Sequence, residues 1–260
     1  MTHATLPGGF AVAALQKLTT LDYPGVVSAM IYTRGCNFHC PYCHNRQLIR
    51  SGKGSVSLEE VLTFLRKRAG LLDGLVVSGG EPTLQPGLAD FCRAAKALGY
   101  RIKLDSNGSR PAVLDALLRE GLLDYAAIDL KAAPQWYASV RQKGARPHNQ
   151  PDNRPHAHPV PAAPGLTAEH GAFEALAQSL ALLRKYDLAH EVRTTCVTPF
   201  VSTDLPEAAA PLVLNAPWLL QRARLDAEAE RAGLAALPET AMEAMAEKAR
   251  GMGMDAGLRE

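Results

Sequence analysis

The sequence predicts an α/β fold in which parallel strands form a closed or partly closed barrel. Short apolar runs rich in Val, Ile and Leu alternate with longer runs of helical periodicity, as in strands that are buried beneath helices on both faces. This alternation predicts right-handed helical crossovers between neighbouring strands. The expected strands cover residues 26–32, 74–77, 101–105, 125–130, 190–197 and 218–222. The expected helices cover residues 58–68, 88–98, 112–119, 168–186 and 240–250, the last capped by Thr240 and stopped by Gly251.

Residues 1–260 are expected to form a single domain, because the alternation runs through most of the chain and this length can bury one sizeable core. The segment 141–165 interrupts the pattern, since it is rich in proline and has almost no large apolar residues. We expect it to be a flexible insertion. A metal site made by His148, His156 and His158 is the alternative, but without a helix or strand to fix them a solvated loop is the simpler interpretation.

Charge and hydropathy exclude several classes of protein. Lys and Arg number 28 against 26 Asp and Glu, the formal net charge is +2, and no block of like charges would attract nucleic acid or an anionic membrane. No apolar run approaches the roughly 18 residues that span a bilayer, and the amino terminus does not resemble a signal peptide. We therefore expect a cytoplasmic protein that binds neither nucleic acid nor membrane.

Three of the five cysteines, Cys36, Cys40 and Cys43, fall within eight residues directly after the first expected strand. Such a cluster favours metal binding over disulfides, and the carboxyl end of a barrel strand is where active sites lie. Three thiolates would leave one iron of a four-iron cluster without a protein ligand and so open to a substrate. A zinc site completed by His44 is the alternative, although structural zinc sites usually join two separated segments.

Polar motifs follow the next expected strands at the same edge of the predicted sheet. The first is Ser-Gly-Gly-Glu-Pro at 78–82, where two glycines let the backbone approach a ligand and Glu81 offers an acceptor for an ammonium group. The next two strands end in Asp-Ser-Asn-Gly at 105–108 and Asp-Leu-Lys at 129–131. On the strand after the insertion, Arg193 and Thr195 either face the same cavity or are polar residues that line the barrel.

The spacing Cys-x3-Cys-x2-Cys, with the aromatic Tyr42 before the last cysteine, resembles the signature of the radical S-adenosylmethionine (SAM) superfamily. The resemblance implies a partial (β/α)6 TIM-like barrel, a [4Fe-4S] cluster held by Cys36, Cys40 and Cys43, and SAM chelated to the fourth iron. It also implies that an electron from the reduced cluster splits SAM to give a carbon-centred radical. The residues implied to bind SAM are Tyr42, Gly79, Gly80, Glu81, Asp105, Ser106, Asn107, Asp129, Lys131 and Arg193.

A narrower resemblance points to one branch of that superfamily. The motifs at 105–108 and 129–131 resemble those of glycyl radical enzyme activases, and the stretch Lys-Leu-Thr-Thr-Leu-Asp-Tyr-Pro-Gly at 17–25 is similar to the activating protein of anaerobic ribonucleoside-triphosphate reductase. The implied partners are the large subunit of that reductase, which would lose a glycine Cα hydrogen, and a reducing flavodoxin or ferredoxin. The alternatives are a radical SAM enzyme that acts on a small molecule and a non-enzymatic zinc-binding module.

Overall fold

A computed structural model of the chain describes residues 9–50, 52–141 and 171–259. The predicted insertion at 141–165 lies outside the described residues except for Arg141, which ends a short helix. In the part of the chain that the structure describes, no helix is both long and apolar enough to cross a membrane.

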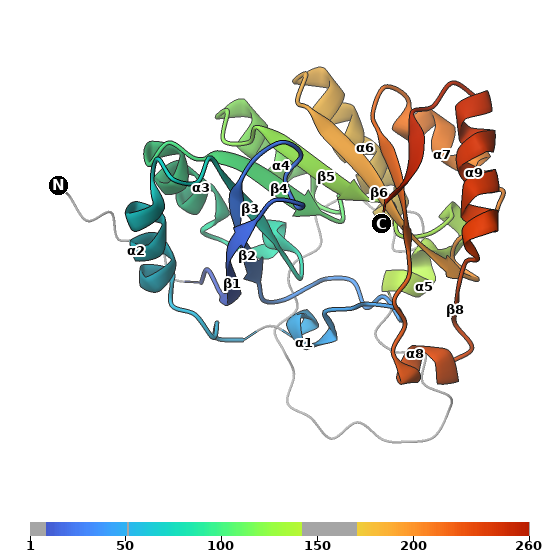
Figure 1. The fold of residues 1–260 in the computed structure, drawn as a ribbon, viewed down its shortest axis with the longest axis horizontal. Helices are drawn as coiled ribbons and strands as arrows, with labels where there is room; N and C mark the ends of the chain where they lie inside the picture. The colour runs from blue at the N-terminus through green and yellow to red at the C-terminus, as the bar shows by residue number, and fades with distance from the viewer. Residues whose placement is uncertain (1–8, 51, 142–170, 260) are drawn as a thin grey trace.

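One sheet forms the centre of the described fold, as Figure 1 shows. From β2 to β7 the strands are parallel neighbours in chain order, β1 pairs antiparallel with β2, and β9 adds to β7 in parallel. The short β8 pairs antiparallel with β6 outside this path. The strands are β1 Val12–Thr19, β2 Ser28–Thr33, β3 Gly74–Gly79, β4 Arg101–Ser106, β5 Tyr125–Asp129, β6 His190–Thr198, β7 Trp218–Arg222, β8 Ala235–Ala236 and β9 Ala256–Arg259.

The sheet is an open barrel. Its edge strands β1 and β9 do not pair with each other among the described residues, and one hydrogen bond from Arg259 Nη2 to the Leu21 carbonyl, 3.0 Å long, spans from one edge to the other. The run of parallel strands from β2 to β7, joined by helices, confirms the predicted partial (β/α)6 barrel.

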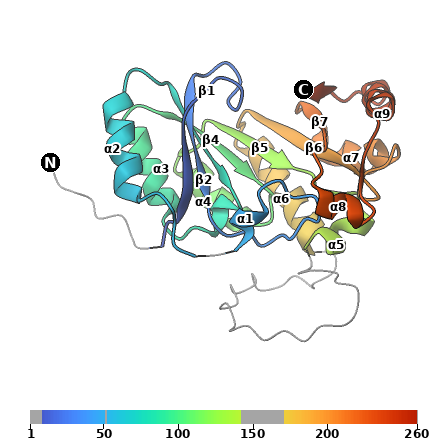
Figure 2. The ribbon, with the colours of Figure 1, turned by 60° about the horizontal axis from the view of Figure 1, so that its bottom comes forward.

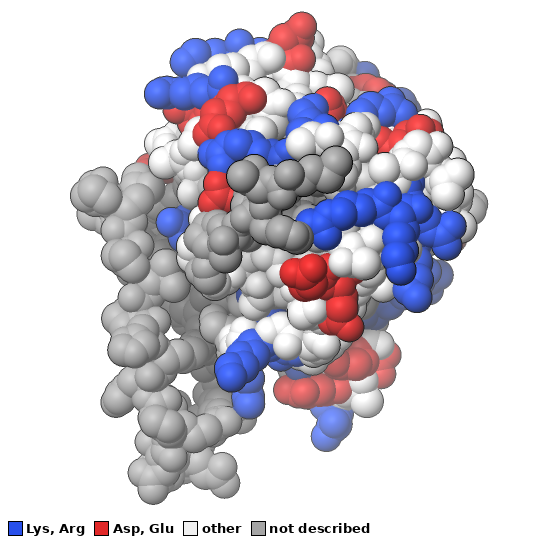
Figure 3. All heavy atoms as spheres, turned by 90° about the vertical axis from the view of Figure 1, so that its left-hand side faces the viewer, with Lys and Arg blue, Asp and Glu red and all other residues white. Residues whose placement is uncertain are grey.

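Long helices cover the outer face of this sheet, and short helices lie at the end to which the parallel strands point (Figure 1). Figure 1 shows α1 and α8 below the sheet, and in Figure 2, where the bottom of that view comes forward, they are drawn in front of its strands. On the side that carries α2, Lys and Arg are interspersed with Asp and Glu (Figure 3). The helices are α1 Arg46–Ile49, α2 Leu58–Arg68, α3 Leu88–Ala97, α4 Pro111–Arg119, α5 Tyr137–Arg141, α6 Gly171–Lys185, α7 Leu205–Val213, α8 Ala227–Arg231 and α9 Glu239–Gly251.

The two faces of the sheet differ in chemistry, which corrects the expectation that its strands are apolar on both sides. Outward side chains such as Ile102, Leu104 and Val192 are buried in the main core under the helices. On the concave face, Lys103 and Arg193 alternate with them along the same strands and pair with carboxylates. The sequence signal of this difference between the two faces is an alternation of apolar and charged residues along a strand, as in Ile102, Lys103 and Leu104.

Several boundaries and elements differ from the sequence prediction. The expected strand at 26–32 is Ser28–Thr33, and the edge strands β1 and β9 were not predicted. The predicted cap at Thr240 is wrong: α9 begins at Glu239, after Pro238, and no side chain caps it by a hydrogen bond. Proline at the cap position fixes the φ angle there but has no side-chain acceptor for the N–H groups of the first turn.

Helix α2 begins with a capping box, and this makes a testable prediction of stability. The Ser57 hydroxyl accepts a hydrogen bond from the Glu60 N–H, while the Glu60 carboxylate accepts one from the Ser57 N–H. Replacing Ser57 by Ala leaves the N–H of Glu60 without its partner and should lower the free energy of unfolding by about 1 kcal/mol. Urea unfolding measures this change. Ser55→Ala is the matched control, because Ser55 lies in the preceding loop, and equal losses in the two variants would contradict the prediction.

Candidate functional site

The three clustered cysteines lie on one loop between β2 and α1, at the carboxyl end of the first parallel strand. Cys40 is buried, Cys36 and Cys43 are half-buried, and all three are free thiols. Backbone hydrogen bonds fix this cysteine loop at several points: the Cys36 N–H donates to the Ile49 carbonyl at 3.1 Å and the Cys43 N–H to the Cys40 carbonyl at 3.0 Å. The loop is therefore held in place before any ligand binds.

Burial makes the thiols of Cys36 and Cys40 weak acids. It raises the pKa of Cys36 to about 12, with a further rise from Glu81, and it raises the pKa of Cys40 to about 11 although Lys131 acts in the opposite direction. These two thiols therefore carry protons at neutral pH. Because the thiolate is the form that binds iron, loading the site must release those protons.

Gly79 ends β3 and Gly80 follows it, and together they let the loop after β3 pack directly on the cysteine loop. A Cβ on Gly80 would lie 2.1 Å from the Gly35 carbonyl oxygen, and one on Gly79 would lie 2.1 Å from the Thr33 nitrogen. The Gly80 N–H donates to the Thr33 carbonyl at 2.9 Å. The two glycines therefore allow the backbone of the loop after β3 to lie against the backbone of residues 33–35. The sequence alone did not reveal this need for glycine.

Glu81 is fully buried, and its carboxylate accepts hydrogen bonds from inside the protein. Its Oε1 accepts from the Thr83 hydroxyl at 2.6 Å and the Ser106 hydroxyl at 2.8 Å, and its Oε2 accepts from the Asn107 N–H at 2.8 Å. Burial raises the pKa of Glu81, whereas these hydrogen bonds act to lower it. The side chain thus joins the loops after β3 and β4, and its role as an acceptor for an ammonium group stays a prediction.

Ser106 and Asn107 are turned towards neighbouring loops in the same way. The Ser106 hydroxyl accepts from the Gly108 N–H at 3.1 Å, and the Asn107 side-chain amide donates to the Asn37 side-chain carbonyl at 3.0 Å. Asn37, which the sequence analysis did not select, also donates to the Ser109 hydroxyl at 2.8 Å. The sequence signal that could have identified Asn37 was its position inside the cysteine motif, directly after Cys36.

Asp105, Asp129, Lys131 and Arg193 form a cluster of alternating charges on the concave face. Arg193 contacts both carboxylates, through Nη1 to Asp105 Oδ2 at 3.3 Å and through Nε to Asp129 Oδ1 at 2.9 Å. Lys131 Nζ lies 2.7 Å from Asp129 Oδ2. Burial alone would raise the pKa of Asp129, but Arg193 and Lys131 outweigh it and hold that pKa at about 2. Asp129 is therefore ionised at neutral pH.

Tyr42 connects the cysteine loop to this cluster. Its ring is buried against Phe200, with ring centroids 5.5 Å apart, and its hydroxyl donates to the Lys131 carbonyl. The Lys131 N–H donates in turn to the Tyr137 hydroxyl at 3.1 Å. Two tyrosines thus hold the peptide of Lys131, and no motif in the sequence marked Tyr137. A cavity of about 140 Å³ adjoins this region and is lined in part by Tyr42, Cys43 and His44.

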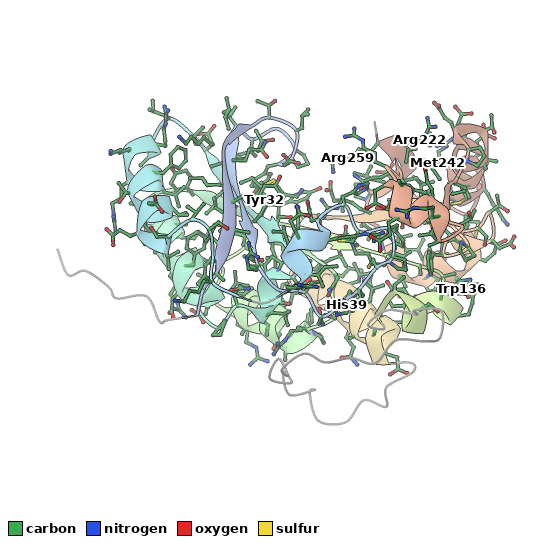
Figure 4. All side chains as sticks on the ribbon, turned by 90° about the horizontal axis from the view of Figure 1, so that it is seen from below. Tyr32, His39, Trp136, Arg222, Met242 and Arg259 are labelled. Atoms are coloured by element: carbon green, nitrogen blue, oxygen red, sulfur yellow. The ribbon has the colours of Figure 1, made fainter. Side chains whose placement is uncertain are left out.

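The predicted site residues lie on the loop after β2 and at the carboxyl ends of β3, β4 and β5, except Arg193, which lies within β6 and pairs in the sheet with Asp129. Figure 4 views the molecule from below and labels His39 of the cysteine loop. Thr195 lies further along β6 and is half-buried. Among the described residues, no group of three or more His, Cys, Asp or Glu side chains has the spacing to hold a metal ion, and this includes the set of Cys36, Cys40, Cys43 and His44.

An open β/α barrel with a three-cysteine loop at the carboxyl end of its first parallel strand defines the class of protein. Residues 30–150, just under half of the chain, match the model of the Radical SAM superfamily. Members of this family use a [4Fe-4S] cluster and SAM.

Relatives of known name agree with this class but differ in activity. A protein of Methanocaldococcus jannaschii, provisionally named a glycyl-radical enzyme activating enzyme, is 41% identical over 124 residues, which cover 46% of this chain and 50% of that protein. An S-adenosylmethionine-dependent nucleotide dehydratase of a Thermoplasmatales archaeon is 31% identical over 104 residues, or 40% of this chain and 37% of that protein. The aligned residues thus span half or less of these relatives.

A solved structure shares the fold over most of the chain. The radical SAM methyltransferase of Sphaerobacter thermophilus superposes with a TM-score of 0.64 and 15% sequence identity, covering 93% of this chain and 68% of the methyltransferase. At this identity the likeness concerns the fold alone.

The contact between the glycine pair and the cysteine loop predicts the effect of a single methyl group. Gly80→Ala should lower the free energy of unfolding by about 1–3 kcal/mol, because its Cβ would overlap the Gly35 carbonyl and the two loops must separate. Thermal unfolding measures the loss. In Gly257→Ala the new Cβ meets open space, so that variant should change stability by less than about 0.5 kcal/mol. The same loss in both variants would show that the contact is unimportant.

Proposed function

We propose that this chain is a radical SAM activase that cleaves SAM reductively and removes a Cα hydrogen from a glycine of a partner glycyl radical enzyme. Anaerobic ribonucleoside-triphosphate reductase is the first candidate partner. The observation that carries the proposal is the placement of three free cysteines of one loop beside the partly buried cluster of Asp105, Asp129, Lys131 and Arg193.

The three cysteines are the ligand type and number that a [4Fe-4S] cluster open at one iron needs, although in this structure they are not grouped closely enough to hold a metal ion. Cys36, Cys40 and Cys43 supply soft thiolate ligands, which select iron–sulfur clusters, and they are free of disulfides. A cluster with three cysteine ligands leaves one iron open to another ligand. When bound, the cluster and SAM together supply a carbon-centred radical after one-electron reduction, and the protein supplies placement and exclusion of water.

The concave face fits the charged part of SAM. Asp105 is buried, and its Oδ1 accepts no hydrogen bond from the described residues, so a buried acceptor is available there. A buried polar atom without a partner is costly, and a bound ligand that donates to it would remove the cost. We assign Asp105, Asp129, Lys131 and Arg193 to the SAM pocket, with Ser106 and Asn107 holding the loop and the backbone of Gly79 and Gly80 facing the methionyl amine.

Glycine is a suitable target for this chemistry. A glycine Cα has no side chain to block the approach of the radical carbon, and its C–H bond is weakened because the flanking amide groups stabilise the product radical. The hydrogen passes to the 5′ carbon, giving 5′-deoxyadenosine and leaving the unpaired electron on the glycine. A reduced flavodoxin or ferredoxin supplies the single electron, which also releases methionine from SAM. The 41% identity to a protein provisionally named as an activase supports this branch.

A small-molecule substrate is the second candidate, and the similarity to a nucleotide dehydratase favours it. The same cysteine loop and SAM pocket serve both candidates, so SAM cleavage by itself does not separate them. The test is whether the unpaired electron ends on a protein glycine.

The cluster assignment predicts the effect of removing one ligand. Cys40→Ala should abolish both cluster assembly and 5′-deoxyadenosine formation after anoxic reconstitution and dithionite reduction, because a cluster that needs three thiolates then has two. Iron, sulfide and 5′-deoxyadenosine are the measured quantities. Cys92→Ala removes a buried thiol from α3 on the other face of the sheet and should retain all three. An unchanged 5′-deoxyadenosine yield in Cys40→Ala would refute the assignment, and zinc in place of iron would favour the zinc-binding module.

The choice of substrate is tested with a partner protein. Reconstituted enzyme, SAM and the large subunit of anaerobic ribonucleoside-triphosphate reductase should give the doublet of a glycyl radical in electron paramagnetic resonance spectra. A reductase variant whose radical-forming glycine is replaced by Ala should give no doublet. SAM cleavage without a glycyl signal on this reductase would direct the search to other glycyl radical enzymes or to small molecules.

A further inference from the structure

A row of alternating charges runs along the concave face from the middle of the sheet to the SAM pocket. Each carboxylate in the row lies between two cations or at an end, and each contact is between 2.7 and 3.3 Å. The row contains Glu191, Lys103, Asp105, Arg193, Asp129 and Lys131, in that order. The last four belong to the proposed pocket, whereas Lys103 and Glu191 have no role in it so far.

Lys103 is fully buried at the centre of β4 and is held from three sides. Its Nζ lies 3.3 Å from Glu191 Oε1, 3.3 Å from Asp105 Oδ1 and 2.5 Å from the Asp22 carbonyl oxygen, to which it donates a hydrogen bond. A buried ammonium group is tolerated only when such partners replace water. Lys103 is therefore held in one position, and two of its three partners, Glu191 and the Asp22 carbonyl, lie outside the pocket.

The third partner belongs to the stretch at 17–25 that the sequence analysis singled out. Between β1 and β2 the chain makes a tight turn in which Thr19 Oγ1 donates to Asp22 Oδ2 at 2.6 Å. Tyr23 then packs on Tyr125 with ring centroids 5.7 Å apart. This turn lies at the amino ends of the parallel strands, opposite the cysteine loop, and forms a floor beneath Lys103. The stretch thus acts on the barrel interior and does not line the SAM pocket.

Asp105 connects Lys103, which is bound to the floor turn, with Arg193 of the proposed pocket. Its two oxygens face two cations, Lys103 on one side and Arg193 on the other. The contact with Lys103 is an ion pair without hydrogen-bond geometry, so Oδ1 is oriented by Lys103 yet accepts no hydrogen bond in the described structure. The direction in which Asp105 offers that oxygen depends on where Lys103 sits.

We infer that Lys103 is a positioning residue for SAM, which acts through Asp105 and is anchored by the floor turn at 19–25. This inference rests on the proposed function, since it assigns Asp105 to the SAM pocket. Glu191 has a different part: it shares Lys103 with Asp105 and also binds Tyr125 and Arg259. Without Glu191, Lys103 still pairs with Asp105. Without Lys103, no cation lies between the buried carboxylates of Glu191 and Asp105.

Unequal effects of substitutions at Lys103 and at its partner Glu191 therefore test the inference. Lys103→Met should weaken SAM binding to the reconstituted protein by about tenfold or more, because a buried charge contact to Asp105 is lost. Glu191→Gln should leave the dissociation constant for SAM within about twofold, because Lys103 then pairs with Asp105 alone. Anoxic equilibrium dialysis with labelled SAM measures both constants, at equal iron content and well below each variant's unfolding temperature.

Two further variants separate positioning from general stability. Lys103→Met/Glu191→Gln removes one buried charge of each sign, so it should recover thermal stability relative to Lys103→Met while SAM binding stays weak. Lys96→Met, which breaks an ion pair of 2.7 Å with Asp124 outside the barrel interior, should leave SAM binding unchanged. Recovery of SAM binding together with stability in the double variant, or equal weakening by Lys103→Met and Glu191→Gln, would overturn the inference. Failure of the wild-type protein to bind SAM would instead refute the proposed function, and the inference with it.

Discussion

The geometry of the whole site depends on the hydrogen bonds of Glu81. Its buried carboxylate accepts hydrogen bonds from Thr83, Ser106 and Asn107, while the backbone N–H of Glu81 donates to the Gly35 carbonyl of the cysteine loop at 2.8 Å. A fully buried carboxylate with missing partners would cost several kcal/mol, so these contacts form together or not at all. The loops after β2, β3 and β4 are consequently one unit, and Gly79 and Gly80 are the residues that let them approach closely enough.

Two kinds of chemistry meet at this unit. The cysteine loop contributes thiols in a largely apolar setting, whereas the concave face of the sheet contributes paired charges that are carried by strands. Because Asp105, Asp129 and Arg193 project from β4, β5 and β6, their positions are set by the register of the sheet and not by loop conformation. A binding pocket built on strands is better ordered than one built on loops. The row of charges extends this order to the floor of the barrel at Asp22.

The sequence predicted the open parallel barrel and the family, because alternating apolar runs and the spacing of three cysteines are local signals. It placed the candidate residues at one edge of the sheet for the same reason, since the carboxyl ends of parallel strands coincide. It did not predict β9, whose four residues carry too short a pattern, or the part played by Lys103, which depends on contacts with residues 81 and 88 positions away. Nor did it predict the hydrogen bonds that Glu81 accepts from Ser106 and Asn107, because these partners follow another strand.

The central claim is that three cysteines of one loop hold a cluster whose fourth iron is free to bind SAM. Electron–nuclear double resonance on the reduced, reconstituted protein with SAM labelled by ¹⁵N at its amino group tests this claim most directly. The account predicts a ¹⁵N hyperfine coupling to the cluster, which Cys40→Ala abolishes together with the cluster. A cluster that shows no coupling to the labelled amine, or whose fourth iron proves to be bound by a side chain of this protein when SAM is present, would contradict it.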